Sequence, residues 1–375
     1  MSKSMTPRRL FNALSYRIGR GLRGAWAAVD GVLWRFSQKS GALSALYYGL
    51  ASTRFRREQS AFLAGRARYL ADLGSERSSQ ALLRRNTHRI EKGLCMRPRR
   101  PLFAAEYIDQ MLTVYRSRML AAASSDECRW ASAVLTEYFT VVDLQRPQMQ
   151  AAKRHFERTL ELAAKGLDSG PAAASDAGQV LAHLAPFQRD LPAQSLVPYE
   201  SLLALSRQRR SVRAFLPKPV PRELVEQAML VALQSPTACN RQPFSFRYFD
   251  DPEWVLKVAK VPMGVTGYED QIPAIIVVVG QMRNFFDERD RHLIYIDGAL
   301  ASMSFILAAE TLGLATCSIN WPDMEEKERE MASLIKLDSD ERPVMLLAVG
   351  YPEPSALVPS SVKRPVGEVL RYNFE

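Results

Sequence analysis

Apolar positions in the first half of the chain recur at helical spacing. One stripe joins four positions spaced i, i+3, i+4 and i+7, as on one face of a helix: Leu43, Leu46, Tyr47 and Leu50. Further helical runs are predicted over residues 81–90, 104–121, 127–143 and 147–165. Residues 1–165 are therefore expected to form a mainly α-helical region.

From Tyr199 onward the pattern alternates between helices and strands. Helices are predicted over residues 199–206, from Pro221 through Ala232, and over 297–312, and strands over 244–249, 275–279, 316–319 and 344–349. Ile275–Val279 is a continuous β-branched run, as expected for a strand buried on both faces. The helix over 297–312 is apolar on nearly all sides, so it must be buried, and a partner subunit is one way to cover it.

A change in composition separates these halves. Gly166–Gly178 is rich in small, polar and helix-breaking residues, which indicates a linker or long loop. We therefore expect a basic helical region over 1–165, a linker over 166–198, and a mixed helix-and-strand domain over 199–375.

Charge is distributed unevenly along the 375 residues. Residues 1–100 hold 21 Lys and Arg against 5 Asp and Glu, a formal charge of +16, whereas the remainder carries −6. Such a block suits an acidic partner or an anionic membrane surface, and nucleic acid is not expected. Solvated helix faces are the plain alternative. The stripe from Leu43 to Leu50, which precedes Arg54, Arg56 and Arg57, fits peripheral membrane contact or, more commonly, packing against neighbouring helices.

The cysteines and the N-terminus bear on the compartment. None of the four cysteines forms a C-x-x-C pair or a cluster with zinc spacing, so no metal site is expected. The first residues lack the apolar core and cleavage site of a signal peptide. A cytoplasmic location is expected, and it is compatible with peripheral contact at the membrane.

One segment before Pro217 concentrates cations in a turn. Arg209, Arg210, Ser211 and Arg213 fall within five residues. Guanidinium groups match phosphate oxygens bidentately, and a serine hydroxyl adds a further donor. Taken alone, the segment would equally suit a solvated basic turn.

A second segment, Ser235–Phe244, lies between a predicted helix and a predicted strand. Its small residues allow close approach of a flat ring, and its amides can satisfy donor and acceptor edges of a flavin or a ribityl chain. The candidate binding residues are Pro236, Thr237, Ala238, Asn240 and Gln242. A capped helix end followed by a turn is the alternative interpretation.

Together these two segments resemble the flavin-binding motifs of the nitroreductase family. The first contributes Arg209, Ser211, Arg213 and Phe215, and the second contributes Ser235, Asn240, Gln242, Pro243 and Phe244. Three further elements follow in the family's order: Asp297–Ala299 in the central helix, Gly313–Ile319, and Gly350–Pro352 followed by Lys363–Pro365. The resemblance covers about residues 199–370.

The resemblance implies an α+β flavoprotein with a nitroreductase-like FMN-binding fold, a central mixed sheet flanked by helices. Members are usually intertwined homodimers with two FMN sites at the interface. It assigns Arg209, Arg210, Ser211 and Arg213 to the phosphate, ribityl and pyrimidine side. It assigns Pro236, Thr237, Ala238, Asn240 and Gln242 to the partner's flavin. It places Ser318, Ile319 and Asn320 near the N5 edge, and Lys363 and Arg364 at the phosphate.

The function that the resemblance implies is FMN-dependent two-electron reduction of a small nitro, quinone or enone-like acceptor, driven by NAD(P)H. One alternative is an FMN dehydrogenase or flavin-consuming enzyme in a biosynthetic pathway, for example of surface polysaccharide. Another is a membrane- or complex-associated assembly protein with a flavin domain. No catalytic side chain is identified, because FMN itself carries the chemistry.

Two local features have competing interpretations. Trp321 follows Asn320 where many family members have glycine, so it either narrows the substrate cavity or packs in the core. The segment His88–Leu94 is similar to one in bacterial nitroreductase-like proteins linked to surface polysaccharide genes. The simpler interpretation is a helix end capped by Gly93.

Overall fold

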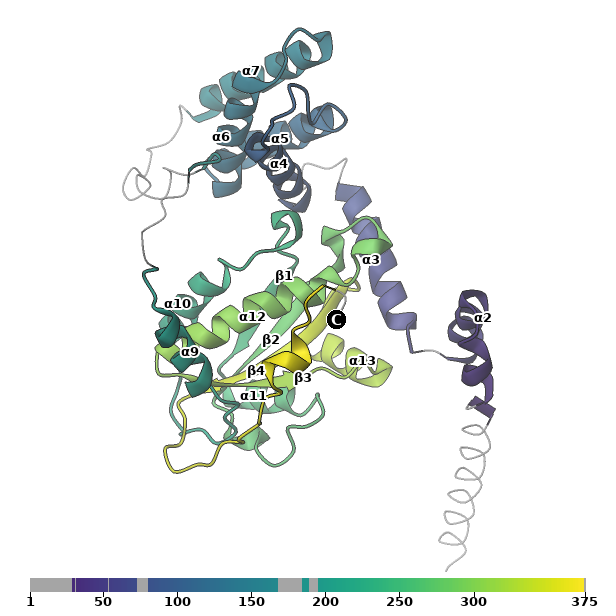
Figure 1. Ribbon diagram of the computed structural model, residues 1–375, viewed down its shortest axis with the longest axis vertical. Coiled ribbons are helices and arrows are strands. Elements are labelled where there is room, and N and C mark those ends of the chain that lie inside the picture. The colour runs from purple at the N-terminus through teal and green to yellow at the C-terminus, as the bar shows by residue number, and fades with distance from the viewer. Residues whose placement is uncertain are drawn as a thin grey trace, which may run out of the picture. The chain divides into compact units, whose positions relative to one another are not determined.

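The computed structural model describes residues 29–30, 32–52, 54–72, 80–167, 184–188 and 195–373 (Figure 1). The predicted linker at 166–198 lies mostly outside these residues. The described elements, in chain order, are α2 (Gly41–Leu46), η1 (Tyr47–Ala51), α3 (Arg56–Asp72), α4 (Gln80–Cys95), α5 (Ile108–Ala122), α6 (Asp126–Val141), α7 (Pro147–Leu167), α9 (Tyr199–Gln208), α10 (Arg222–Ala232), η3 (Ala238–Asn240), β1 (Phe244–Phe249), α11 (Pro252–Ala259), η4 (Glu269–Gln271), β2 (Ala274–Gln281), η5 (Met282–Asn284), η6 (Glu288–Asp290), α12 (Leu293–Thr311), β3 (Ala315–Asn320), α13 (Glu325–Leu334), β4 (Glu341–Gly350) and α14 (Val366–Val369).

The chain divides into two compact units. The small unit comprises residues 1–60 with 323–325, and the large unit comprises residues 61–322 with 326–375. In the small unit, the predicted stripe lies on α2 and η1, where Leu46 and Leu50 are 57% and 79% exposed. No residue of α2 is buried. Within the described residues, the stripe therefore does not pack into a helical core.

The helices α4 to α7 share one apolar core within the large unit. Its members include Leu82, Ile90, Met111, Leu135 and Phe156, all less than 5% exposed. These helices confirm the four predicted runs, although α4 continues five residues past the predicted end and α5 begins at Ile108, four residues after the predicted start. The apolar face of each helix packs against the other helices. Tertiary packing therefore stabilises these helices more than their local helix propensity does.

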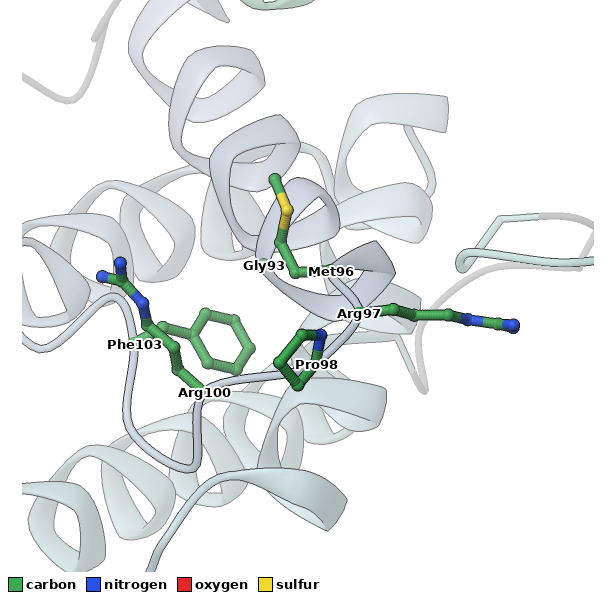
Figure 2. Close-up of a pocket in the computed structure, with 6 residues that line it drawn as sticks. All are labelled: Gly93, Met96, Arg97, Pro98, Arg100 and Phe103. Atoms are coloured by element: carbon green, nitrogen blue, oxygen red, sulfur yellow. The ribbon is translucent and has the colours of Figure 1, made fainter.

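Gly93 does not cap a helix, so that prediction is wrong. The helix α4 continues to Cys95, and a Cβ added at Gly93 would lie 2.3 Å from Cδ2 of Phe103. Glycine is required there because the Phe103 ring lies directly against the helix backbone. Gly93 and Phe103 line a pocket of about 580 Å³, and the Arg97 and Arg100 guanidinium groups extend away from each other at its rim (Figure 2).

A four-stranded sheet in the order β1-β2-β4-β3 forms the centre of the C-terminal region. The predicted sheet flanked by helices is confirmed, but its strands are all antiparallel rather than mixed. The parallel pairing seen among the described residues is a single bridge between Ser211 and Thr316. Burial explains the difference, because an antiparallel strand covered on both faces has the same continuous apolar run as a parallel one.

Alternate residues of β2 supply two separate cores. Ile275, Val277 and Val279 face one core together with α11 and α13. Ala274, Ile276 and Val278 face the other, together with α10 and α12. The sheet is therefore the middle of three layers, and α12 lies across one of its faces (Figure 1).

By length and composition, the segment Glu288–Thr311 around α12 would suffice to cross a membrane. Half of its most apolar stretch is buried in the structure. Phe305 and Ala309 are fully buried against the sheet, which is the environment of a core helix. The predicted burial of α12 is therefore confirmed for one side, whereas Ile296, Leu300 and Met303 are exposed in the single chain.

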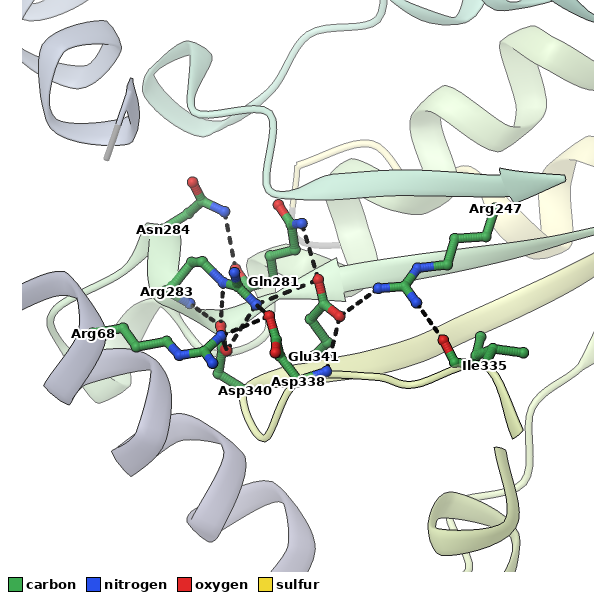
Figure 3. A network of polar contacts seen from close by, with 9 residues as sticks. All are labelled: Arg68, Arg247, Gln281, Arg283, Asn284, Ile335, Asp338, Asp340 and Glu341. Carbon is green, nitrogen blue, oxygen red and sulfur yellow. Dashed lines mark hydrogen bonds and ion pairs between the residues drawn. The ribbon is translucent and has the colours of Figure 1, made fainter. Parts of the chain in front are cut away.

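An arginine–carboxylate network ties α3 to the sheet (Figure 3). Arg68 contacts Asp340 at 2.6 Å and Asp338 at 2.8 Å, and Arg283 joins the same two carboxylates. The Arg68 guanidinium, assisted by Arg283, holds the pKa of Asp338 well below its usual range. Gly65 permits this approach, because a Cβ there would lie 2.6 Å from the Met282 backbone. The part of α3 from Ala61 onward is thus held in the large unit.

Candidate functional site

The first motif runs along the free edge of the sheet. The helix α9 ends at Gln208, and the chain then extends beside β3, where the Val212 N–H donates to the Thr316 carbonyl at 3.1 Å. Ser211 and Thr316 form a parallel bridge. The structure therefore brings the predicted residues 209–213 next to the strand that carries Ser318, Ile319 and Asn320.

Along β3, the side chains alternate between solvent and core. Ser318 and Asn320 are exposed, whereas Ile319 is buried in the core against α13. Ile319 can therefore offer a ligand only its backbone, while its neighbours offer polar side chains. Thr316 and Asn320 lie about 13 Å apart at the usual rise of a strand. This edge is long enough for an extended ligand with two ends of different chemistry.

Arg209 has a donor that the protein does not satisfy. Its side chain is half-buried, and its Nε is buried without a hydrogen-bond partner among the described residues. A buried unsatisfied N–H costs about 1–3 kcal/mol, so an acceptor from outside the chain would be bound favourably here. Phosphate oxygens are such acceptors, and the first motif therefore fits a phosphate group.

Arg210 and Arg213 point toward different neighbours. Arg210 donates to the Arg209 carbonyl at 3.1 Å and lines a cavity of about 280 Å³ with Gly313 and Pro352. Arg213 is exposed and lies beside Tyr268. Burial raises the pKa of Tyr268, and the Arg213 guanidinium opposes that rise. The motif therefore spreads its cations over two sides of the edge.

The second motif folds into a strained loop ahead of β1. Cys239, Asn240 and Gln242 have φ angles of 54°, 52° and 49°, which non-glycine residues seldom adopt. Side chains maintain the loop: Thr237 Oγ1 accepts from the Gln242 N–H at 3.2 Å, and Gln242 Nε2 donates to Asn240 Oδ1 at 3.1 Å. Strain of this kind is concentrated at functional sites in proteins.

Asp297 of α12 anchors this loop. Its Oδ2 accepts from the Ala238 N–H at 3.0 Å, and its side chain is only 2% exposed. Burial raises the pKa of Asp297, while the Ala238 N–H and Arg241 oppose the rise. The sequence noted Asp297 only as the start of a helix, but α12 begins four residues earlier. A carboxylate within so apolar a helix was the signal in the sequence that could have revealed this role.

One chain keeps the two motifs far apart. The second motif lies at the Asp297 end of α12, whereas Gln208 contacts Glu310 near the other end at 3.0 Å. Thirteen helical residues correspond to about 20 Å. The motifs also lie at opposite edges of the sheet, beside β1 and β3. The structure therefore does not bring Pro236, Thr237, Ala238, Asn240 and Gln242 to the first motif of the same chain.

The C-terminal cations lie in an exposed segment. The chain touches the first motif where the Glu353 N–H donates to the Ala214 carbonyl at 3.1 Å. Lys363 and Arg364 follow ten residues later, and both are exposed. Their assignment to the phosphate stays a prediction.

Trp321 packs in the core rather than in a cavity. Its side chain is 9% exposed, and its Nε1–H donates to Glu328 Oε1 at 2.6 Å. Arg342 pairs with the same carboxylate oxygen at 3.1 Å. Of the two interpretations of Trp321, packing is therefore confirmed.

Comparisons with known proteins cover this same region. A family model described as Nitroreductase family matches residues 206–264 and 269–351, which include both motifs and all four strands. Iodotyrosine deiodinase of Nematostella vectensis is 25% identical over 214 residues, 49% of this chain and 78% of that protein. Iodotyrosine deiodinase 1 of Homo sapiens is 23% identical over 194 residues, 44% of this chain and 66% of that protein. A solved FMN-dependent nitroreductase from Clostridium difficile R20291 matches 46% of this chain and 99% of its own, at 19% identity and a TM-score of 0.40.

Proposed function

Since the Nitroreductase family model matches residues 206–264 and 269–351, we propose that this chain is an FMN-dependent oxidoreductase. NAD(P)H donates two electrons, and a small nitro, quinone or enone-like molecule accepts them. The observation that carries the proposal is the unsatisfied, buried Nε of Arg209 on the sheet edge that also exposes Ser318 and Asn320. That edge offers a phosphate site at one end and polar side chains at the other.

A second copy of the chain completes the site in this proposal. The helix α12 exposes Ile296, Leu300 and Met303 by 48%, 43% and 42%, and these residues recur at i, i+4 and i+7 on one face. An apolar face of this kind favours burial against a partner. An isologous homodimer would cover it and would bring the partner's Asn240 and Gln242 to the first motif.

Bound FMN supplies the hydride chemistry, and the chain's own residues bind and orient it. Arg209, Arg210 and Ser211 would hold the phosphate, together with Lys363 and Arg364. Ser318 and Asn320 would lie beside the ring. No side chain need move a proton to or from FMN. The chain's own residues would select the substrate through the shape and charge of the site.

The experiment that tests this function is anaerobic mixing of the FMN-loaded protein with NADH and with NADPH, followed by acceptors. Loss of flavin absorbance with one nucleotide, and its return with a nitroarene or quinone, supports the proposal. The acceptor panel includes an aryl iodide, because both relatives named above are iodotyrosine deiodinases. Reduction by dithionite but by neither nucleotide would overturn the NAD(P)H step and favour the FMN dehydrogenase alternative.

Replacing Arg213 with glutamine is expected to make bound FMN harder to reduce. Reduction leaves a negative charge on the pyrimidine side of the flavin, to which the resemblance assigns Arg213. A cation about 4 Å from such a charge is worth roughly 4 kcal/mol at an effective dielectric near 20. Arg213 is exposed, so solvent screens most of that attraction. We therefore expect a shift of about 20–45 mV to lower potential, because about 30 mV corresponds to 1.4 kcal/mol for two electrons. Equal midpoint potentials for the wild type and Arg213→Gln at saturating FMN would exclude this role.

A further inference from the structure

The first helix of the α4–α7 group reaches the second motif. Arg84 of α4 donates from Nη2 to the Arg241 carbonyl at 3.2 Å, and α4 packs against η3. Arg241 is 3% exposed and follows Asn240 directly. Helical residues outside the nitroreductase-family domain therefore form a wall beside the loop that carries Asn240 and Gln242.

This wall presents arginines stacked on aromatic rings. The Arg85 guanidinium lies 5.0 Å from the centre of the Phe286 ring, and the Arg89 guanidinium lies 3.6 Å from the centre of the Tyr107 ring. Both arginine side chains are half-buried. Stacking of this kind fixes the orientation of a guanidinium. Arg85 also forms a side-chain hydrogen bond with Tyr69, and its remaining N–H groups lie at the edge of the stacked plane.

Carboxylates do not neutralise these two arginines within the described residues. Arg241 pairs with Asp290 at 3.1 Å, whereas neither Arg85 nor Arg89 takes part in an ion pair there. Burial lowers the pKa of Arg85, and the neighbouring Arg241 and Arg89 lower it further. Tyr69 and Cys239 oppose this lowering, and neither residue is a carboxylate.

Like charges held together at partial burial favour binding of an anion. The wall supplies two guanidinium groups of fixed orientation, and the loop beside it supplies the Cys239–Gln242 backbone held in its strained conformation. Planar guanidinium groups bind carboxylate and phosphate oxygens bidentately. The two arginines lie beside the second motif, which the proposal places at the flavin. The anion is therefore most simply part of a molecule that approaches the flavin.

We propose that Arg85 and Arg89 bind an oxyanion, a carboxylate or a phosphate, carried by the substrate of this enzyme. This inference rests on the proposed function and names its substrate class: an acceptor with a reducible group at one end and an anionic group at the other. The helical region thereby determines specificity, while the nitroreductase-family domain holds the cofactor.

The test compares an anionic acceptor with its neutral counterpart. The FMN-loaded protein is titrated with 4-nitrobenzoate, 4-nitrophenyl phosphate and 4-nitrobenzamide, by calorimetry and by steady-state reduction. For whichever anionic acceptor binds, Arg85→Gln and Arg89→Gln are each expected to raise Kd and KM about tenfold. That is the usual effect of losing one charged hydrogen bond. The same variants should leave Kd and KM for the amide, and kcat for both kinds of acceptor, unchanged.

Two further variants serve as controls. Arg222→Gln alters an exposed arginine paired with Asp250 and should change none of these constants. Arg85→Lys keeps the charge but loses the planar fork, so it should retain part of the preference for the anion even where Arg85→Gln folds poorly.

Unchanged binding of both anions in Arg85→Gln and Arg89→Gln would overturn the inference, and so would equal loss of the amide. If the protein reduces no acceptor, the proposed function fails, and calorimetric binding of the anions still decides the role of the arginines. If neither anion binds better than the amide to the wild type, the anionic substrate class is wrong although reduction proceeds.

Discussion

Replacing Glu328 with alanine is expected to destabilise the large unit by about 3–5 kcal/mol, because the change removes a carboxylate from a buried cation. Glu328 Oε1 and Arg342 Nη2 are 3.1 Å apart, and both side chains are 1% exposed. Trp321 donates to the same oxygen. Denaturant unfolding of the wild type and the variant measures the difference.

Two variants separate loss of this pair from loss of helix surface. Glu330→Ala alters an exposed residue of the same helix that pairs with Lys327, and it should cost less than about 1 kcal/mol. Glu328→Ala combined with Arg342→Met should recover much of the stability, because no buried charge is then left behind. A single-variant loss below about 1 kcal/mol would contradict the assignment of Glu328 as the counter-ion of Arg342.

Replacing Arg209 with glutamine is expected to weaken FMN binding by roughly 10- to 100-fold, since a hydrogen bond to a charged group contributes about 1.5–3 kcal/mol. Its buried, unsatisfied Nε is the donor that a phosphate oxygen would accept. Arg207→Gln, two residues earlier on the exposed surface of α9, is the matched control and should bind FMN as the wild type does. Flavin fluorescence during titration of the apoprotein gives both constants. Equal affinities for Arg207→Gln and Arg209→Gln would remove Arg209 from the phosphate site.

The sequence predicts the strands and the long helices of the fold well. The strand β1 has the predicted limits, Phe244 and Phe249, and β2 extends the predicted run by a few residues at its ends. Their signals are local, because β-branched and aromatic residues cluster between turn residues. Strand direction is not local, and the expectation of a mixed sheet was wrong for that reason.

Sequence spacing could not reveal the contacts that hold the loop of the second motif in place. Asp297 and Ala238 are 59 residues apart, and Arg84 and Arg241 are 157 residues apart. Both contacts depend on how α12 and α4 pack, which no motif encodes. Gly93 illustrates the same limit: the sequence suggests a cap, whereas the Phe103 ring, ten residues later, determines why glycine is needed.

The measurement that tests the central claim most directly is the absorbance spectrum of the purified full-length protein with excess FMN removed, followed by identification of the flavin that denaturation releases. We predict a yellow protein that releases FMN, not FAD, at one FMN per chain in a dimer. A protein that stays colourless after incubation with excess FMN, although folded by circular dichroism, would contradict the proposal that residues 206–351 form an FMN site.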